Sequence, residues 1–146
     1  MKIVRAMKEA SRIKGEIKEI KKRVSKCLNI LEGNEITEKF DDLMKLLEEK
    51  TGKLISLKTG IMAANTEGDM FKVIVRLGEL KSHMDFLREL EPKKGSQLDG
   101  YRDTAVRYES QWSDGEKNRA IQTTQNEINK LTDQLDEFNS STDIKF

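Results

Sequence analysis

The aromatic and charged residues that could bind a ligand gather in one short stretch of the chain. Both tyrosines and the only tryptophan lie within twelve residues, and arginine and acidic side chains are interleaved with them. Aromatic rings stack on nucleobases, and a guanidinium group binds phosphate or carboxylate through two parallel hydrogen bonds. This composition is typical of a site for a small anionic, nucleotide-like ligand. The candidate ligand-binding residues are Tyr101, Arg102, Arg107, Tyr108, Glu109 and Trp112.

The same residues also have a purely structural interpretation. Val106, Tyr108 and Trp112 would then plug a helical bundle, while Arg107 and Glu109 would form ion pairs with another subunit. Extended arms with aromatic anchors commonly hold subunits together, so this is the commoner use of such a segment. The residue types alone fit both interpretations.

Motifs of known enzyme classes are absent from the sequence. It contains no serine-hydrolase elbow, phosphate-binding loop, zinc-protease motif or cysteine pair. The single histidine, His83, precedes the apolar residue Met84, so its imidazole is expected to be solvated rather than to act as a catalytic base. The acidic pairs at 41–42 and 48–49 fit solvated helix faces better than a metal site, although carboxylates from two subunits could still meet. We predict no enzymatic activity, cofactor or metal.

A long heptad pattern near the start of the chain provides the main architectural signal. Nine apolar or small residues recur at alternating steps of three and four, which predicts a helix that supercoils left-handedly with a partner, as in a coiled coil. At about 1.5 Å per residue this helix would be roughly 44 Å long. The seam consists of Ile3, Ala6, Ala10, Ile13, Ile17, Ile20, Val24, Cys27 and Leu31.

Charge is balanced over the whole chain but not over this first helix. The formal net charge is +1, which indicates neither nucleic acid nor a membrane as a partner. Residues 1–31 nevertheless carry ten Lys or Arg against three Glu. A solvated face that pairs with acidic positions of another helix is the favoured interpretation, and an anion-binding or membrane-surface face is the alternative.

The second helix is expected to form an antiparallel hairpin with the first. Gly33 suits the left-handed position after a helix end, and a seam at three-four spacing resumes a few residues later. Lys50 is the one polar residue on this second seam. It either fixes the register of the pair or lies where the seam opens to water.

Two further helices and an arm complete the predicted architecture. Asn65 or Thr66 would cap the third helix, Pro92 would end it, and the Ser113–Glu116 pair has the spacing of a capping box that starts the fourth. The apolar surface of the third helix is wide, which predicts a central position. The predicted helices span about residues 2–32, 35–63, 66–91 and 114–139 of a single domain over 1–146, with an extended arm over about 92–113.

The arm shows the period-two alternation of a strand between Thr104 and Trp112. A lone strand is unstable, so the expected partner is the same arm of another subunit. Cys27, the only cysteine, lies on a seam and is expected to act as a small buried hydrophobe. Nowhere do 18 apolar residues run together, and the expected location is the cytoplasm.

The order of these features resembles the septicolysin-like family of small bacterial helical proteins. The resemblance spans most of the chain and rests on the basic first helix, the segment 59–66, the segment 85–90, the arm around 107–110 and the close at 131–144. Where the family typically has Asn-Trp near the end, Ser140 follows Asn139 here, and Arg107 and Glu109 match the family's arm only approximately. The resemblance implies a helical fold and oligomerisation. The pore-forming activity that the family label suggests is not transferred.

We therefore predict an all-α protein of four heptad-patterned helices that assembles into a homo-oligomer. It is expected to bind or sequester a small anionic or nucleotide-like ligand at sites between subunits near the arm. The first alternative is a self-assembling structural scaffold without a ligand. The second is a membrane-active, septicolysin-like protein that uses its basic first helix. Neither nucleic acid nor a membrane is the expected partner.

Overall fold

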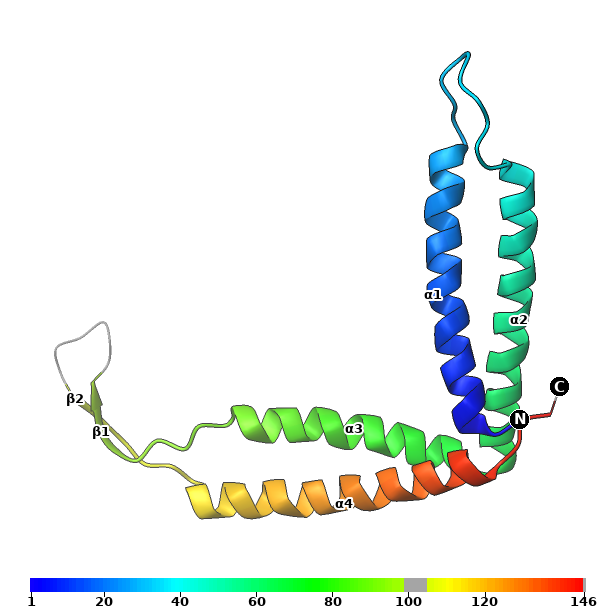
Figure 1. Ribbon diagram of the computed structural model, residues 1–146. Coiled ribbons are helices and arrows are strands. Elements are labelled where there is room, and N and C mark those ends of the chain that lie inside the picture. The colour runs from blue at the N-terminus through cyan, green and yellow to red at the C-terminus, as the bar shows by residue number, and fades with distance from the viewer. Residues whose placement is uncertain (99–104, 146) are drawn as a thin grey trace. The chain divides into compact units, whose positions relative to one another are not determined.

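The structure is a computed structural model that describes residues 1–98 and 105–145, and it confirms the predicted all-α fold. Its described elements are α1 (Ile3–Cys27), α2 (Phe40–Glu67), α3 (Met70–Glu89), β1 (Gly95–Leu98), β2 (Ala105–Tyr108) and α4 (Asp114–Ser141) (Figure 1). The chain divides into two compact units. Unit 1 comprises Met1–Met70 with Asp136–Phe146, and unit 2 comprises Phe71–Leu135.

In unit 1, α1 and α2 lie side by side and antiparallel, as the short connection predicted (Figure 1). The first part of the heptad seam is buried, because each of its apolar residues meets the facing side of α2 or the end of the chain. Burying one such side chain contributes roughly 1.5–3 kcal/mol. The buried core consists of Ile3, Ala6, Ile13, Leu57, Ala64 and Ile144.

The first helix is shorter than its sequence pattern predicted. It ends at Cys27, a half-buried residue, rather than near residue 32, and α2 begins at Phe40 rather than 35. Leu31, the last residue of the predicted seam, is 78% exposed. Gly33 does adopt a positive φ of 87°, but within a turn in which the Asn34 N–H donates to the Leu31 carbonyl at 3.0 Å. The heptad pattern thus runs on past the point at which α2 ceases to provide a partner surface.

The second helix is longer than predicted at its other end. Asn65 and Thr66, the expected caps of the next helix, lie inside α2, which runs to Glu67. Thr66 satisfies its hydroxyl within the helix by donating to the Met62 carbonyl at 2.9 Å. The chain turns instead at Gly68 and Asp69, the latter with a φ of 59°.

The last residues of the chain pack against the start of α1 and the α1–α2 core within unit 1. The Ile3 N–H donates to the Thr142 carbonyl at 2.9 Å, and Lys2 Nζ lies 2.8 Å from Asp143 Oδ2. Ile144 is only 4% exposed and joins the core between α1 and α2. The sequence left open whether residues 143–146 pack or fray, and the segment docks through its one large aliphatic side chain.

In unit 2, α3 and α4 lie alongside each other and pack through a second core (Figure 1). Its buried members are Leu77, Met84 and Ile128. His83, next to Met84, is exposed, as predicted. Arg76 Nε donates to Glu127 Oε1 at 2.7 Å and links the two helices at their surface. The wide apolar surface predicted a central α3, yet within this unit only one side of the helix is buried.

The arm folds back on itself within one chain. β1 and β2 pair antiparallel, with Gly95 opposite Tyr108 and Ser96 opposite Arg107. The prediction that β2 would pair with the arm of another subunit is therefore wrong for the edge of β2 that faces β1, because β1 supplies the hydrogen-bonding partners there. The strand is also shorter than the alternating pattern, ending at Tyr108.

Candidate functional site

The base of the arm, where the hairpin leaves α3 and rejoins α4, contains a hollow of about 410 Å³. It forms because the strand register places the residues that follow α3 beside those that follow β2. Its walls therefore come from two segments about twenty residues apart in the sequence. The lining residues are Leu90, Glu91, Pro92, Lys93, Tyr108, Glu109, Ser110, Gln111 and Trp112.

A second hollow, of about 620 Å³, shares part of this lining. Pro92, Glu109, Ser110 and Trp112 line both. The second hollow adds Lys94 and the first residues of α4, at Ser113, Asp114 and Gly115. Trp112 thus borders two adjacent hollows, one beside Lys93 and the other beside Lys94 and the N-terminal end of a helix.

Local hydrogen bonds hold Trp112 in place. Its backbone N–H donates to Ser110 Oγ at 3.2 Å, forming a tight turn. The predicted capping box follows at once: the Glu116 N–H donates to Ser113 Oγ at 3.1 Å, and the Ser113 N–H donates to Glu116 Oε2 at 2.9 Å. The half-buried indole is therefore fixed between a turn and a capped helix start.

Two lysines shape the other wall. Lys93 Nζ lies 5.3 Å from the centre of the Tyr108 ring, in cation–π geometry. Lys117 on α4 donates to the backbone carbonyls of Arg88, at 3.2 Å, and Leu90, and so ties the end of α3 to α4. These contacts set the position of the segment that carries Pro92 and Lys93.

The predicted site residues are only partly brought together. Tyr108, Glu109 and Trp112 all line the first hollow. Arg107 is exposed on β2 opposite Ser96 and does not line it. Tyr101 and Arg102 lie outside the described residues.

Sequence reasoning missed the contribution of Pro92, Lys93 and Lys94. Residues 91–96 were predicted to end a helix and start the arm but not to bind a ligand, although two consecutive lysines beside a proline and near an aromatic segment were a usable signal.

The chemistry of the hollows suits a ligand with an aromatic ring and a phosphate. Trp112 and Tyr108 offer ring faces, and Lys93 and Lys94 offer ammonium groups that attract phosphate. Glu91 and Glu109 carry only hydrogen-bond acceptors when ionised, which match sugar hydroxyls or base amino groups.

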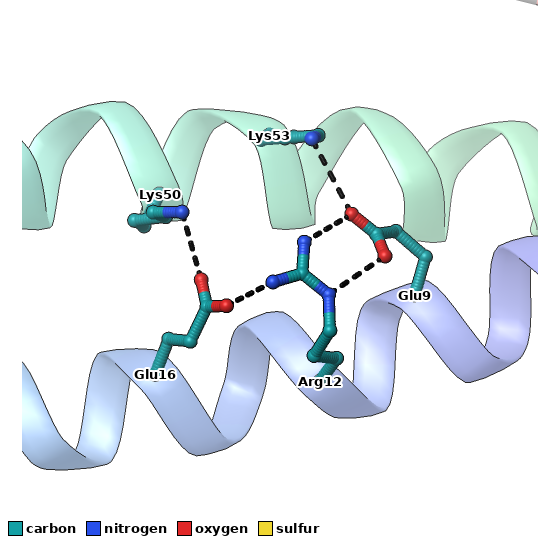
Figure 2. A network of polar contacts seen from close by, with 5 residues as sticks. All are labelled: Glu9, Arg12, Glu16, Lys50 and Lys53. Carbon is teal, nitrogen blue, oxygen red and sulfur yellow. Dashed lines mark hydrogen bonds and ion pairs between the residues drawn. The ribbon is translucent and has the colours of Figure 1, made fainter.

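A separate polar network joins α1 and α2 (Figure 2). Arg12 donates from Nε, at 2.9 Å, and from Nη2, at 2.6 Å, to the two carboxylate oxygens of Glu9, and it also bonds Glu16. Lys50 Nζ lies 2.7 Å from Glu16 Oε2, and Lys53 Nζ lies 3.3 Å from Glu9 Oε1. Lys50, the polar residue on the second seam, thus contacts α1.

The network shifts the pKa values of its members. The hydrogen bond from Arg12 lowers the pKa of Glu9 to about 2, and the contact with Lys50 lowers the pKa of Glu16. Glu9 in turn raises the pKa of Arg12. Every carboxylate here is compensated by a cation, so the network suits a structural role rather than acid–base catalysis.

Residues 1–98 and 105–145 contain no group of three or more histidine, cysteine, aspartate or glutamate side chains arranged to hold a metal ion. None of the helices in this part of the chain is both long and apolar enough to cross a membrane.

The fold defines the class of protein, which is an all-α chain of two helical hairpins with a small β-hairpin arm. The chain belongs to a family of unknown function (DUF6847), whose model matches residues 11–144. It is also similar to a solved structure described as a functionally unknown conserved protein from Corynebacterium diphtheriae, with 16% sequence identity, a TM-score of 0.78 and 99% of each chain covered. At this identity the likeness shows the fold alone. A comparison with curated proteins finds no match.

Proposed function

We propose that this chain is a non-enzymatic, cytoplasmic binding protein that assembles into a homo-oligomer and holds a small anionic, nucleotide-like ligand at the base of its arm. One observation carries the proposal: Tyr108, Trp112 and Lys93 line the same hollow, so two aromatic rings and an ammonium group belong to one candidate site. Ring stacking and phosphate attraction are the two interactions on which nucleotide binding most often depends.

Exposed apolar side chains on α3 support the assembly part of the proposal. Phe71, Val75 and Phe86 are spaced so that they fall along one side of the helix, and Val75 and Phe86 are 62% and 55% exposed. Gly78 and Ser82 lie between them on the same side, which would allow a neighbouring helix to approach closely. A second copy of this chain is the occupant we propose, and it would bring a second arm near the first.

The chain offers its own probe for the ligand, because Trp112 is its only tryptophan. Titration with ATP, ADP, AMP, cyclic AMP and inorganic phosphate, followed by tryptophan fluorescence, should show a saturable change for at least one nucleotide. Removing a charged donor from a ligand phosphate costs roughly 1.5–3 kcal/mol. Lys93→Ala should therefore weaken binding by about tenfold or more, while Lys81→Ala, at an exposed position on α3, should not.

Two results would favour a structural role over ligand binding. If no nucleotide changes the fluorescence of an intact oligomer, the chain acts as a structural scaffold. If Trp112→Ala dissociates the oligomer instead of abolishing binding, or if Arg107→Ala dissociates it, the arm is a clasp between subunits. Native mass spectrometry of gently purified protein reads both, since it reports the subunit number and any retained small molecule.

The membrane-active alternative rests on the basic face of α1 and on the septicolysin-like resemblance. It predicts leakage from vesicles that contain anionic lipids. Intact vesicles at all lipid compositions tested would rule it out.

A further inference from the structure

The outer side of α1 carries a stripe of lysines, which we name the lysine stripe. Its members lie along a shallow hollow of about 690 Å³. Successive members four residues apart are about 6 Å apart along the helix axis, and like charges at this spacing destabilise a helix. The lysine stripe consists of Lys14, Lys18, Lys21, Lys22 and Lys26, all exposed.

Among the described residues, one ion pair engages this stripe. Lys22 pairs with Glu19 at 2.9 Å. Within the described part of the chain, the remaining four lysines of the stripe have no ion-pair partner. Ile17 and the lysine stems give the hollow an apolar floor. A surface of this kind suits a partner that presents carboxylates on a helix.

The outer side of α2 carries the opposite charge. Four exposed acidic residues occupy its first ten positions, with Lys45 as the one cation among them. No ion pair engages these carboxylates among the residues that the structure describes. This acidic stripe consists of Asp41, Asp42, Glu48 and Glu49.

The two stripes lie at the same level of the α1–α2 hairpin. Glu16 of α1 is 2.7 Å from Lys50, and Arg23 Nε is 2.9 Å from Glu38 Oε1. Residues 16–23 therefore lie across from residues 38–50. A second hairpin placed beside the first, without a shift along the helix axis, would bring its acidic stripe level with the lysine stripe.

The loop between the two helices adds apolar surface at this end of the hairpin. Four large aliphatic side chains there are exposed. In a side-by-side pair of hairpins they would lie near their counterparts, because no axial shift separates the copies. They are Leu28, Ile30, Leu31 and Ile36.

We propose that the lysine stripe of one copy docks on the acidic stripe of a second copy, and that this contact sets the arrangement of the assembly. The inference rests on the proposed homo-oligomer and specifies one of its contacts. Because the two stripes are different surfaces, the contact is head-to-tail, and it builds a ring if the rotation closes and a filament if it does not.

Complementary charge reversal tests the contact. One variant carries Lys14→Glu with Lys18→Glu, and the other carries Glu48→Lys with Glu49→Lys. Each alone would place like charges across the interface, so its dissociation constant should rise by about tenfold or more. An equimolar mixture should restore assembly with the two variants alternating. Lys81→Glu with Lys130→Glu, at exposed positions of unit 2, makes the same change in net charge as the Lys14→Glu with Lys18→Glu variant and should leave assembly unchanged.

The readout is the mass of the assembly by light scattering, with helicity by circular dichroism confirming that each variant is folded. For the unaltered chain, raising NaCl from about 50 mM to about 500 mM should weaken assembly as the charges are screened. Charge-reversed variants that assemble alone as well as the unaltered chain would overturn this inference while leaving the proposed oligomer standing. A monomeric unaltered chain at low salt would overturn both, and the tryptophan titration would still decide ligand binding.

Discussion

Lys50 on α2 and Glu16 on α1 meet at 2.7 Å across the interface between the two helices. Glu16 is also bonded by Arg12, one turn away on its own helix, so a single carboxylate joins both helices (Figure 2). The heptad pattern alone leaves open whether Lys50 fixes the register of the two helices or faces water. The contact with Glu16 shows that it links α2 to a defined position on α1.

The pH dependence of stability follows from this network. Glu9 has its pKa lowered to about 2, chiefly by Arg12, and the pKa of Glu16 is lowered chiefly by Lys50. Because a glutamate in an unfolded chain titrates near pH 4.3, the stabilisation is complete above that pH and is lost as the pH falls toward about 2. The midpoint of thermal unfolding, followed by circular dichroism, should decrease across this window, by a modest amount since the groups are partly exposed.

The Glu9→Gln variant provides the control for this pH dependence. It should unfold at a lower temperature than the unaltered chain at pH 7 and should show a shallower fall on acidification. An unaltered chain whose unfolding midpoint stays flat over the same window would contradict the assignment.

Gly52, inside α2, and Gly68, at the C-terminal end of α2, should respond in opposite directions to substitution by alanine. A Cβ at Gly68 would come within 2.5 Å of Phe138 Cζ, whereas a Cβ at Gly52 would meet nothing within 4 Å. Gly68→Ala should lower the free energy of unfolding by about 1–3 kcal/mol through overpacking. Gly52→Ala should raise it by about 0.5–1 kcal/mol, because alanine favours the helix interior. Urea unfolding measures both, and a Gly68→Ala variant as stable as the unaltered chain or more stable would refute the packing around Gly68.

The start of α4 should depend on its capping box. Ser113→Ala removes the oxygen that accepts from the Glu116 N–H and should lower the free energy of unfolding by about 1 kcal/mol. Thermal unfolding of Ser113→Ala, Glu116→Ala and the double variant gives the coupling between the two residues. Strictly additive losses would mean that the two hydrogen bonds act independently rather than as a box.

The sequence predicted the parts of the fold that depend on local pattern and composition. The buried positions of α1, the capping box at Ser113 and the exposed His83 follow from period and spacing alone. The ends of α1 and α2 could not be predicted, since a heptad pattern does not reveal where the facing helix stops. Leu31 continues the pattern and is nevertheless exposed.

The arm shows a second limit of local pattern. β2 has alternating residues, whereas β1 reads Gly-Ser-Gln-Leu and carries no strand signal. Their pairing places Lys93 near Tyr108, so half of the candidate site could be recognised only once the partner strand was known. Tyr108, Glu109 and Trp112 could be predicted as site residues because the chemistry of a side chain follows from its residue type, without knowledge of its neighbours.

The docking of Ile144 between α1 and α2 has a consequence for how the protein folds as it is made. The α1–α2 hairpin depends on contacts close in sequence and can form early, but its core lacks one member until the chain beyond α4 has been synthesised. The whole of unit 2 is translated in that interval. The hairpin core that contains Ile3 and Ala6 is therefore complete only after a residue more than 130 positions away has been synthesised.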